Sequence, residues 1–149
     1  MRRSLMSCRR SWKVREEKKS YPALGFETSF AELSPLGDSI ANLIYSLALS
    51  RVLGRVVGKK VSNSILAEAV VKAGLREHAG TRMDKQSLGD FAESLLAQAF
   101  LQEALTLEEC VSLLARELRF SRKEELREAS VTAFAALLSR ARDAVWEEE

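Results

Sequence analysis

The sequence has little of what redox, zinc and disulfide sites need. It contains two cysteines and one histidine in 149 residues, which excludes zinc fingers, iron–sulfur cages and a disulfide scaffold and argues against a Ser-His-Asp or Cys-His site. Only two prolines and seven glycines are present, so a turn-rich β-sandwich or β-barrel is not expected. The longest uncharged run, residues 39–50, is too short to span a bilayer.

What is present is typical of one folded domain. Hydrophobic residues make up 46% of the chain and charged residues 30%, which is an ordinary globular balance. A domain of this size buries about two-thirds of its unfolded surface and needs no disulfide or metal to stay folded. We therefore expect a single domain over residues 26–146, and a cytoplasmic location.

Charge is distributed unevenly along the chain. The first 20 residues carry eight basic and two acidic side chains, a net charge of +6, whereas the remainder is −4. This pattern predicts a flexible basic arm over residues 1–25 that has an affinity for polyanions. A solvated tail, an upstream extension before Met6 and an organelle transit peptide are the alternatives. Residues 147–149 are all glutamate and are expected to form a solvated acidic tail.

The apolar spacing from Phe30 onward is helical, and no strand pair is needed anywhere. We expect the fold class to be all-α, with His78 in a loop. Caps are assigned to Ser34, to Ser62 or Asn63, to Asp84, and to the capping boxes that begin at Thr106 and Ser121. The helices predicted from these signals cover residues 35–53, 63–74, 84–102, 106–118 and 121–146.

Three carboxylates stand in otherwise uncharged helices. Between Gln86 and Gln102 the only charged residues are Asp90 and Glu93, and Asp38 is the only one in residues 36–50. Side chains at i and i+3 lie about 5–6 Å apart on a helix, so this like-charged pair repels unless a cation or a proton intervenes. Each acid taken alone can be an exposed residue, and Asp38 can favour the start of its helix. Taken together, they predict that two helices pack and bring their carboxylates together.

A hard divalent cation would remove the cost of burying such a cluster. Mg²⁺ prefers a few carboxylates together with waters and phosphate oxygens, and Mn²⁺ can replace it. Zinc and copper are poor candidates because no histidine or thiol is near in sequence. A magnesium ion held beside a polyanion is typical of phosphodiester hydrolysis.

Three blocks of sequence together resemble the ribonuclease III family. They are LGDSI over residues 36–40, KVSN over residues 60–63 followed by LA at 66–67, and GDFAES over residues 89–94 followed by LLA at 95–97. Their order and spacing fit the family, and the resemblance covers residues 30–118. Nothing after Ser121 resembles the double-stranded-RNA-binding domain of longer members. The chain is therefore most similar to the short forms that have only the endonuclease domain.

The resemblance implies an all-α homodimer that cuts double-stranded RNA with Mg²⁺. It assigns Asp38, Asp90 and Glu93 as catalytic and metal-binding acids. The sequence departs from the family pattern at two positions: Ser34 stands where the family has a glutamate, and Pro35 stands where it tends to have phenylalanine. Glu32 is a doubtful substitute for the missing glutamate, because its spacing is wrong for the same helical face.

A basic connection follows the first predicted helix. If this connection lies beside the acids, it can hold RNA phosphates, which supply most of the non-specific affinity of such proteins. The alternative is a solvated helix end. The RNA-binding candidates from this region and from the start of the Asp90 helix are Arg51, Arg55, Lys59, Lys60, Ser62, Asn63 and Lys85.

Three functional hypotheses follow from the sequence. The first is a magnesium-dependent, dimeric endonuclease for double-stranded or folded RNA that takes part in RNA processing. The second is a non-catalytic, ribosome-associated RNA-binding protein of the same fold, which Ser34 and the basic arm favour. The third is an unrelated helical interaction module. The separation of the Asp38 and Glu93 side chains distinguishes the first hypothesis from the third.

Overall fold

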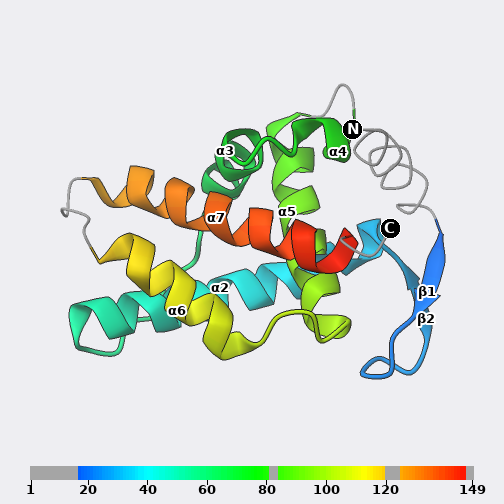
Figure 1. The fold of residues 1–149 in the computed structure, drawn as a ribbon, viewed down its shortest axis with the longest axis horizontal. Coiled ribbons are helices and arrows are strands. Elements are labelled where there is room, and N and C mark those ends of the chain that lie inside the picture. The colour runs from blue at the N-terminus through cyan, green and yellow to red at the C-terminus, as the bar shows by residue number, and fades with distance from the viewer. Residues whose placement is uncertain (1–16, 81–83, 120–124, 147–149) are drawn as a thin grey trace.

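The computed structural model describes residues 17–80, 84–119 and 125–146, and in these ranges it is a bundle of helices with one small hairpin (Figure 1). The all-α fold class expected from the sequence is confirmed. None of the described helices is both long and apolar enough to cross a membrane. In order, the elements are β1 (Lys18–Ser20), β2 (Glu27–Ser29), the 3-10 helix η1 (Ala31–Leu33), α2 (Ser34–Leu53), α3 (Asn63–Lys72), α4 (Arg76–Ala79), α5 (Lys85–Leu101), α6 (Leu107–Leu118) and α7 (Leu126–Trp146).

Most helix ends are set by the residues that the sequence indicates. The side chains of Ser62 and Asp84 accept hydrogen bonds from the first turns of α3 and α5. Thr106 and Glu109 form a reciprocal capping box at the start of α6. Gly54 ends α2 in the left-handed conformation at φ 72°, which glycine adopts without steric cost. The capping box predicted at Ser121 lies outside the described residues.

The start of α2 differs from the prediction. Ser34 is the first residue of the helix rather than its cap, and Leu33, at the end of η1, precedes it without a side-chain cap. The helix begins one residue early because the 3-10 turn leads directly into it. The Ser34 hydroxyl is consequently available for another partner.

The expectation that no strands form was wrong. β1 and β2 pair antiparallel, with Lys18 opposite Ser29 and Ser20 opposite Glu27. Tyr21, which follows β1, is 4% exposed and packs with Leu33 and Ala97. The segment over residues 1–25, expected to be a flexible arm, thus contains β1 and a buried aromatic residue that packs on the helices. Residues 1–16 and the tail at 147–149 lie outside the described residues.

The prediction that His78 lies in a loop was also wrong. It lies in the one-turn helix α4, is 4% exposed, and its ring is 5.4 Å from that of Trp146 near the end of α7. Desolvation by burial lowers the pKa of this histidine. His78 is thus a packing residue that joins α4 to α7, and not a loop residue.

The central helix is α5, which packs against α2, α3 and α7. In Figure 1 it passes behind α7 and beside α2. Every residue from Leu88 to Ala99 except Asp90 is buried. A helix that is apolar on nearly all sides is a buried one, which explains why α5 carries so few charges. The fold therefore places Glu93, from the middle of α5, inside the protein.

Candidate functional site

The site begins where α2 and α5 approach closely. A Cβ atom added to Gly37 of α2 would lie 1.8 Å from the backbone oxygen of Glu93 in α5. No side chain fits in such a gap, so only glycine permits this contact. Asp38 follows Gly37 directly, and the close approach brings its carboxylate to Glu93.

Glu93 is a buried acid without a basic partner. It is 6% exposed, and its Oε1 accepts a hydrogen bond of 2.8 Å from the Ser34 hydroxyl. Burial raises its pKa to about 7, with further increases from the side chains of Asp38 and Asp90. Among the described residues, no lysine or arginine pairs with it. A proton or a cation would therefore reduce the repulsion between these buried carboxylates.

Asp38 and Asp90 are half-buried and complete the cluster. Oδ1 of Asp38 lies 3.5 Å from the Asn42 amide nitrogen, and Oδ1 of Asp90 accepts a hydrogen bond of 3.0 Å from the amide of Gln86. The structure thus brings the three predicted acids together from two helices. One carboxylate oxygen of each acid faces a neutral hydrogen-bond donor.

The three acids supply carboxylate oxygens as potential metal ligands. Among the described residues, no group of three or more His, Cys, Asp or Glu side chains is placed so that it could hold a metal ion by itself. Mg²⁺ does not need one, because it is usually bound through one or two carboxylates and keeps several waters. Asp38, Asp90 and Glu93 offer only oxygen ligands, which is the ligand type that Mg²⁺ prefers.

Glu32 has a different position. Its Oε1 accepts a hydrogen bond of 2.8 Å from the Ser29 amide, and it is exposed. This backbone hydrogen bond is the main cause that lowers the pKa of Glu32. Glu32 is not among the groups that act on Glu93. The structure gives Glu32 a role at the start of η1.

A second glycine contact joins α3 to the site. A Cβ atom at Gly89 would lie 2.2 Å from the amide nitrogen of the Asn63 side chain. Asn63, at the start of α3, therefore packs directly against α5 beside Asp90. Ser62 and Lys60 precede it in the chain, so the connection predicted to bind RNA ends next to the acids.

The rest of this connection is fastened along α2. We call residues 55–61 the strap. The Ser46 hydroxyl binds both backbone groups of Lys59, at 2.8 and 3.0 Å, and the Ser50 hydroxyl binds both of Val57, at 2.9 and 3.1 Å. The Val61 amide donates to Asn42 Oδ1 at 2.9 Å.

The spacing explains why the strap fits. Four residues of helix rise about 6 Å and two residues of extended chain span about 6.6 Å. Polar side chains at every fourth position of α2 can therefore bind every second residue of an extended segment. The same face of α2 that carries Asp38 holds the strap, which leads Lys59 and Lys60 toward the acids.

A sequence model of the ribonuclease III family matches residues 31–145. The chain belongs to the ribonuclease III family. This match covers every described element except the hairpin and the last residue of α7. A search of curated proteins found no match.

Two residues predicted to bind RNA in this ribonuclease III-family domain have acidic neighbours outside the cluster. Both terminal nitrogens of Arg51 bind the Glu108 carboxylate of α6, at 3.1 and 3.2 Å. Arg51 lies about 20 Å along α2 from Asp38. The hydrogen bond from Arg127 is the main cause that lowers the pKa of Glu68 in α3, and the charge of Lys85, at the start of α5, lowers it further.

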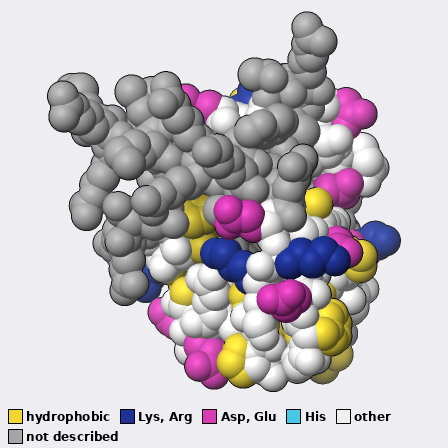
Figure 2. Space-filling view, turned by 90° about the vertical axis from the view of Figure 1, so that its right-hand side faces the viewer, with side chains coloured by type: hydrophobic (Ala, Val, Ile, Leu, Met, Phe, Trp, Pro, Cys, Tyr) yellow, Lys and Arg dark blue, Asp and Glu magenta, His cyan; other side chains and the backbone are white. Residues whose placement is uncertain are grey.

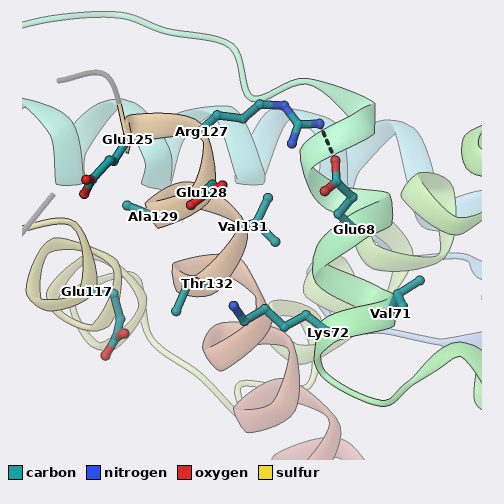
Figure 3. Close-up of a pocket in the computed structure, with 10 residues that line it drawn as sticks. All are labelled: Glu68, Val71, Lys72, Glu117, Glu125, Arg127, Glu128, Ala129, Val131 and Thr132. Carbon is teal, nitrogen blue, oxygen red and sulfur yellow. Dashed lines mark hydrogen bonds and ion pairs between the residues drawn. The ribbon is translucent and has the colours of Figure 1, made fainter. Parts of the chain in front are cut away.

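One cavity of the ribonuclease III-family domain lies away from the acids. It measures about 790 Å³ and is enclosed by α3, α6 and the start of α7, with the Arg127–Glu68 ion pair across one side (Figure 3). None of the three acids lines it. A smaller pocket of about 120 Å³ adjoins Asp90 between η1 and α5 and is lined by Phe30, Phe91 and Ser94. This smaller pocket borders the acid cluster at Asp90.

In its described part, the face at the hairpin end of the molecule carries basic and acidic side chains mixed together. In Figure 2 the described lysine, arginine and acidic side chains on that face stand beside one another, with apolar side chains between them. Within the described part of that face, the basic side chains do not gather into one broad patch.

Sequence reasoning missed three contributors to the site. Ser34 binds Glu93, Gln86 binds Asp90, and Ser46 fastens the strap. Polar residues stand four positions apart on one face of this helix, at Asp38, Asn42, Ser46 and Ser50, and this pattern could have indicated a segment bound along it. Ser34 was noted only as a departure from the family pattern, and its hydrogen bond to Glu93 depends on the contact between α2 and α5.

Proposed function

We propose that this protein is a magnesium-dependent endoribonuclease that hydrolyses phosphodiester bonds of double-stranded or folded RNA. The observation that carries the proposal is the buried Glu93 carboxylate, which faces Asp38 and Asp90 and has no basic partner among the described residues. Membership of the ribonuclease III family supports a ribonuclease-related function.

Each of the three acids has a neutral neighbour that can orient its carboxylate. Ser34, Asn42 and Gln86 each face one carboxylate oxygen, which orients the acid and leaves its other oxygen for the ion. Second-layer donors of this kind commonly fix the geometry of metal ligands. A bound Mg²⁺ would lower the pKa of a water molecule and neutralise charge that develops on the scissile phosphate.

The strap is the proposed contact with RNA. Its backbone is held to α2 by Ser46 and Ser50, and it leads through Val61, which binds Asn42, to Asn63, which packs against α5 next to Asp90. A basic segment fixed in this way can align phosphates with the acids without reading bases, which is how double-stranded RNA is usually recognised. The proposed RNA-binding residues beside the acids are Lys59, Lys60, Ser62 and Asn63, with Arg55 farther along the strap.

A homodimer is proposed from one face of α2. Leu36, Leu43 and Leu47 are 37%, 50% and 39% exposed, and their spacing puts them on one side of the helix. Three leucines in a line on the surface are typical of an interface. A second copy that packs on this stripe would cover them and supply a second acid cluster to the RNA.

A non-catalytic RNA-binding protein is the second candidate. Ser34 supplies a hydroxyl where the family pattern has a carboxylate, so the cluster carries one acid fewer. This alternative keeps the RNA-binding strap and loses hydrolysis.

Cleavage assays distinguish the two. Purified full-length protein is incubated with double-stranded RNA, single-stranded RNA and double-stranded DNA of one sequence, with Mg²⁺ or with EDTA. The endonuclease predicts new RNA ends from the duplex only when Mg²⁺ is present. Intact strands at an excess of protein, together with salt-sensitive RNA binding, would identify the non-catalytic protein instead.

A further inference from the structure

The small pocket between η1 and α5 is distinct from the acid cluster that it borders. It measures about 120 Å³, and neither Asp38 nor Glu93 lines it. The residues that line it are Phe30, Ala31, Ser87, Asp90, Phe91 and Ser94. The pocket therefore shares one residue, Asp90, with the proposed metal site, and its other walls have no role in the proposed hydrolysis.

One polar side chain of this pocket is buried without a partner. Ser94 is 1% exposed and lines the pocket, and among the described residues its hydroxyl has no hydrogen-bond partner. A buried hydroxyl without a hydrogen bond is costly, so a ligand that enters the pocket and binds Ser94 would remove this cost. Ser87 lies two helical turns earlier on the same face of α5 and also lines the pocket.

The walls determine which kind of ligand fits. The rings of Phe30 and Phe91, with centroids 5.6 Å apart, give the pocket an apolar side. The hydroxyls of Ser87 and Ser94 can each donate or accept a hydrogen bond. No lysine or arginine is among the described lining residues, and the negative charge of Asp90 repels a phosphate. The pocket therefore suits a neutral ligand that is partly apolar and forms hydrogen bonds.

The volume limits the size of that ligand. A space of 120 Å³ holds about four water molecules, which suits one heterocyclic ring better than two fused rings. Proteins recognise unpaired RNA bases through contacts with aromatic side chains and hydrogen bonds to the base edges. We propose that this pocket receives a single unpaired pyrimidine base of the RNA. The inference rests on the proposed function and adds a feature of the substrate, a bulged or looped pyrimidine near the bond that is cut.

Binding of bulged duplexes tests this without cleavage. Full-length protein in EDTA is titrated into fluorescent RNA duplexes that are identical except at one central position. That position is fully paired, or it carries an unpaired uridine, an unpaired adenosine or an unpaired abasic ribose. The abasic duplex keeps the interruption of the stack but offers no base, so the ratio of its dissociation constant to that of the uridine duplex measures the contribution of the base. Fluorescence anisotropy gives each constant.

Two variants change the pocket itself. Ser94→Ala removes the hydroxyl that has no partner, and Ala31→Leu adds bulk at an exposed position of the pocket wall. Ala23→Leu is the matched control, because it makes the same change at an exposed position that does not line the pocket. Circular dichroism checks that each variant is folded.

The wild type and Ala23→Leu are expected to bind the uridine bulge about tenfold more tightly than the abasic bulge, as for one base stacked on aromatic side chains. The adenosine bulge should bind like the abasic one, because its fused rings do not fit. Ser94→Ala should lower the uridine preference about threefold, the effect of one lost hydrogen bond. A folded Ala31→Leu should abolish the preference.

Equal binding of the uridine and abasic bulges by the wild type would overturn the inference and show that the pocket holds water only. An equal gain for adenosine, an unchanged preference in Ser94→Ala, or no RNA binding in EDTA would also overturn it. The proposed function fails on a separate observation, namely duplex RNA that stays intact with Mg²⁺ at an excess of protein.

Discussion

Gly37 lies directly against the backbone of Glu93, so close that a Cβ atom would come within 1.8 Å of the Glu93 carbonyl oxygen. The contact is between backbones, which cannot move aside as a flexible side chain can. It sets the distance between α2 and α5, and with it the distance between Asp38 and Glu93.

Gly37→Ala is therefore expected to separate the two helices and to destabilise the domain by about 3 kcal/mol. Gly58→Ala is the matched control, because nothing lies within 4 Å of its added Cβ and its φ is not positive. Urea unfolding of both variants measures the difference. An equal, small change in the two would show that the close approach is not a constraint.

Removing one hydroxyl should loosen the strap without changing its charge. Ser46→Ala loses two hydrogen bonds to the Lys59 backbone, and we expect a fall in stability of about 1 kcal/mol together with weaker RNA binding. Lys60→Ala should instead remove one phosphate contact and reduce the salt dependence of binding by about one unit. Fluorescence anisotropy over a range of salt concentrations separates the two effects. A Lys60→Ala slope equal to that of the wild type would exclude this lysine from the interface with RNA.

Stability should depend on pH through Glu93. Its pKa is raised to about 7 in the folded protein, so the folded state holds this proton more tightly than the unfolded state does. The contribution of Glu93 is most favourable below pH 4.5 and is lost as the pH rises to about 7. Glu93→Gln should therefore gain stability relative to the wild type between pH 5 and pH 8, by about 2 kcal/mol. Urea unfolding across this range gives the difference, and a difference that does not vary with pH would contradict the raised pKa.

The leucine stripe of α2 predicts the oligomeric state. Leu43→Glu combined with Leu47→Glu places two charges on the proposed interface, and we expect a monomer where the wild type is a dimer. Val71→Glu, at a position on α3 that is 50% exposed, should leave the dimer intact. Analytical ultracentrifugation tests all three. A monomeric wild type would remove the proposed interface.

Much of the fold could be predicted from local signals. Ser62, Asp84 and Thr106 begin helices because a side-chain oxygen satisfies a free amide, which is a short-range effect visible in sequence. The hairpin escaped prediction because its strands are three residues each. Such short strands carry no periodicity, and the burial of Tyr21 that stabilises them is a tertiary contact.

The candidate site was predictable in its acids but not in their surroundings. Asp38, Asp90 and Glu93 stand out because charge is missing around them. The partner of Ser34 lies 59 residues away, so its role follows only from how the helices cross. Arg51 was favoured as an RNA contact by its charge, yet its position faces Glu108 of α6.

The most direct measurement is the rate of duplex RNA cleavage in Mg²⁺ by Asp38→Asn and Glu93→Gln, with RNA affinity measured on the same samples. Glu27→Gln, at the exposed first residue of β2, is the matched control. The account predicts that the first two variants bind RNA and lose at least a hundredfold in cleavage rate, on the order expected when a catalytic group is removed, while the control cleaves like the wild type. Cleavage by Glu93→Gln at the wild-type rate would contradict it.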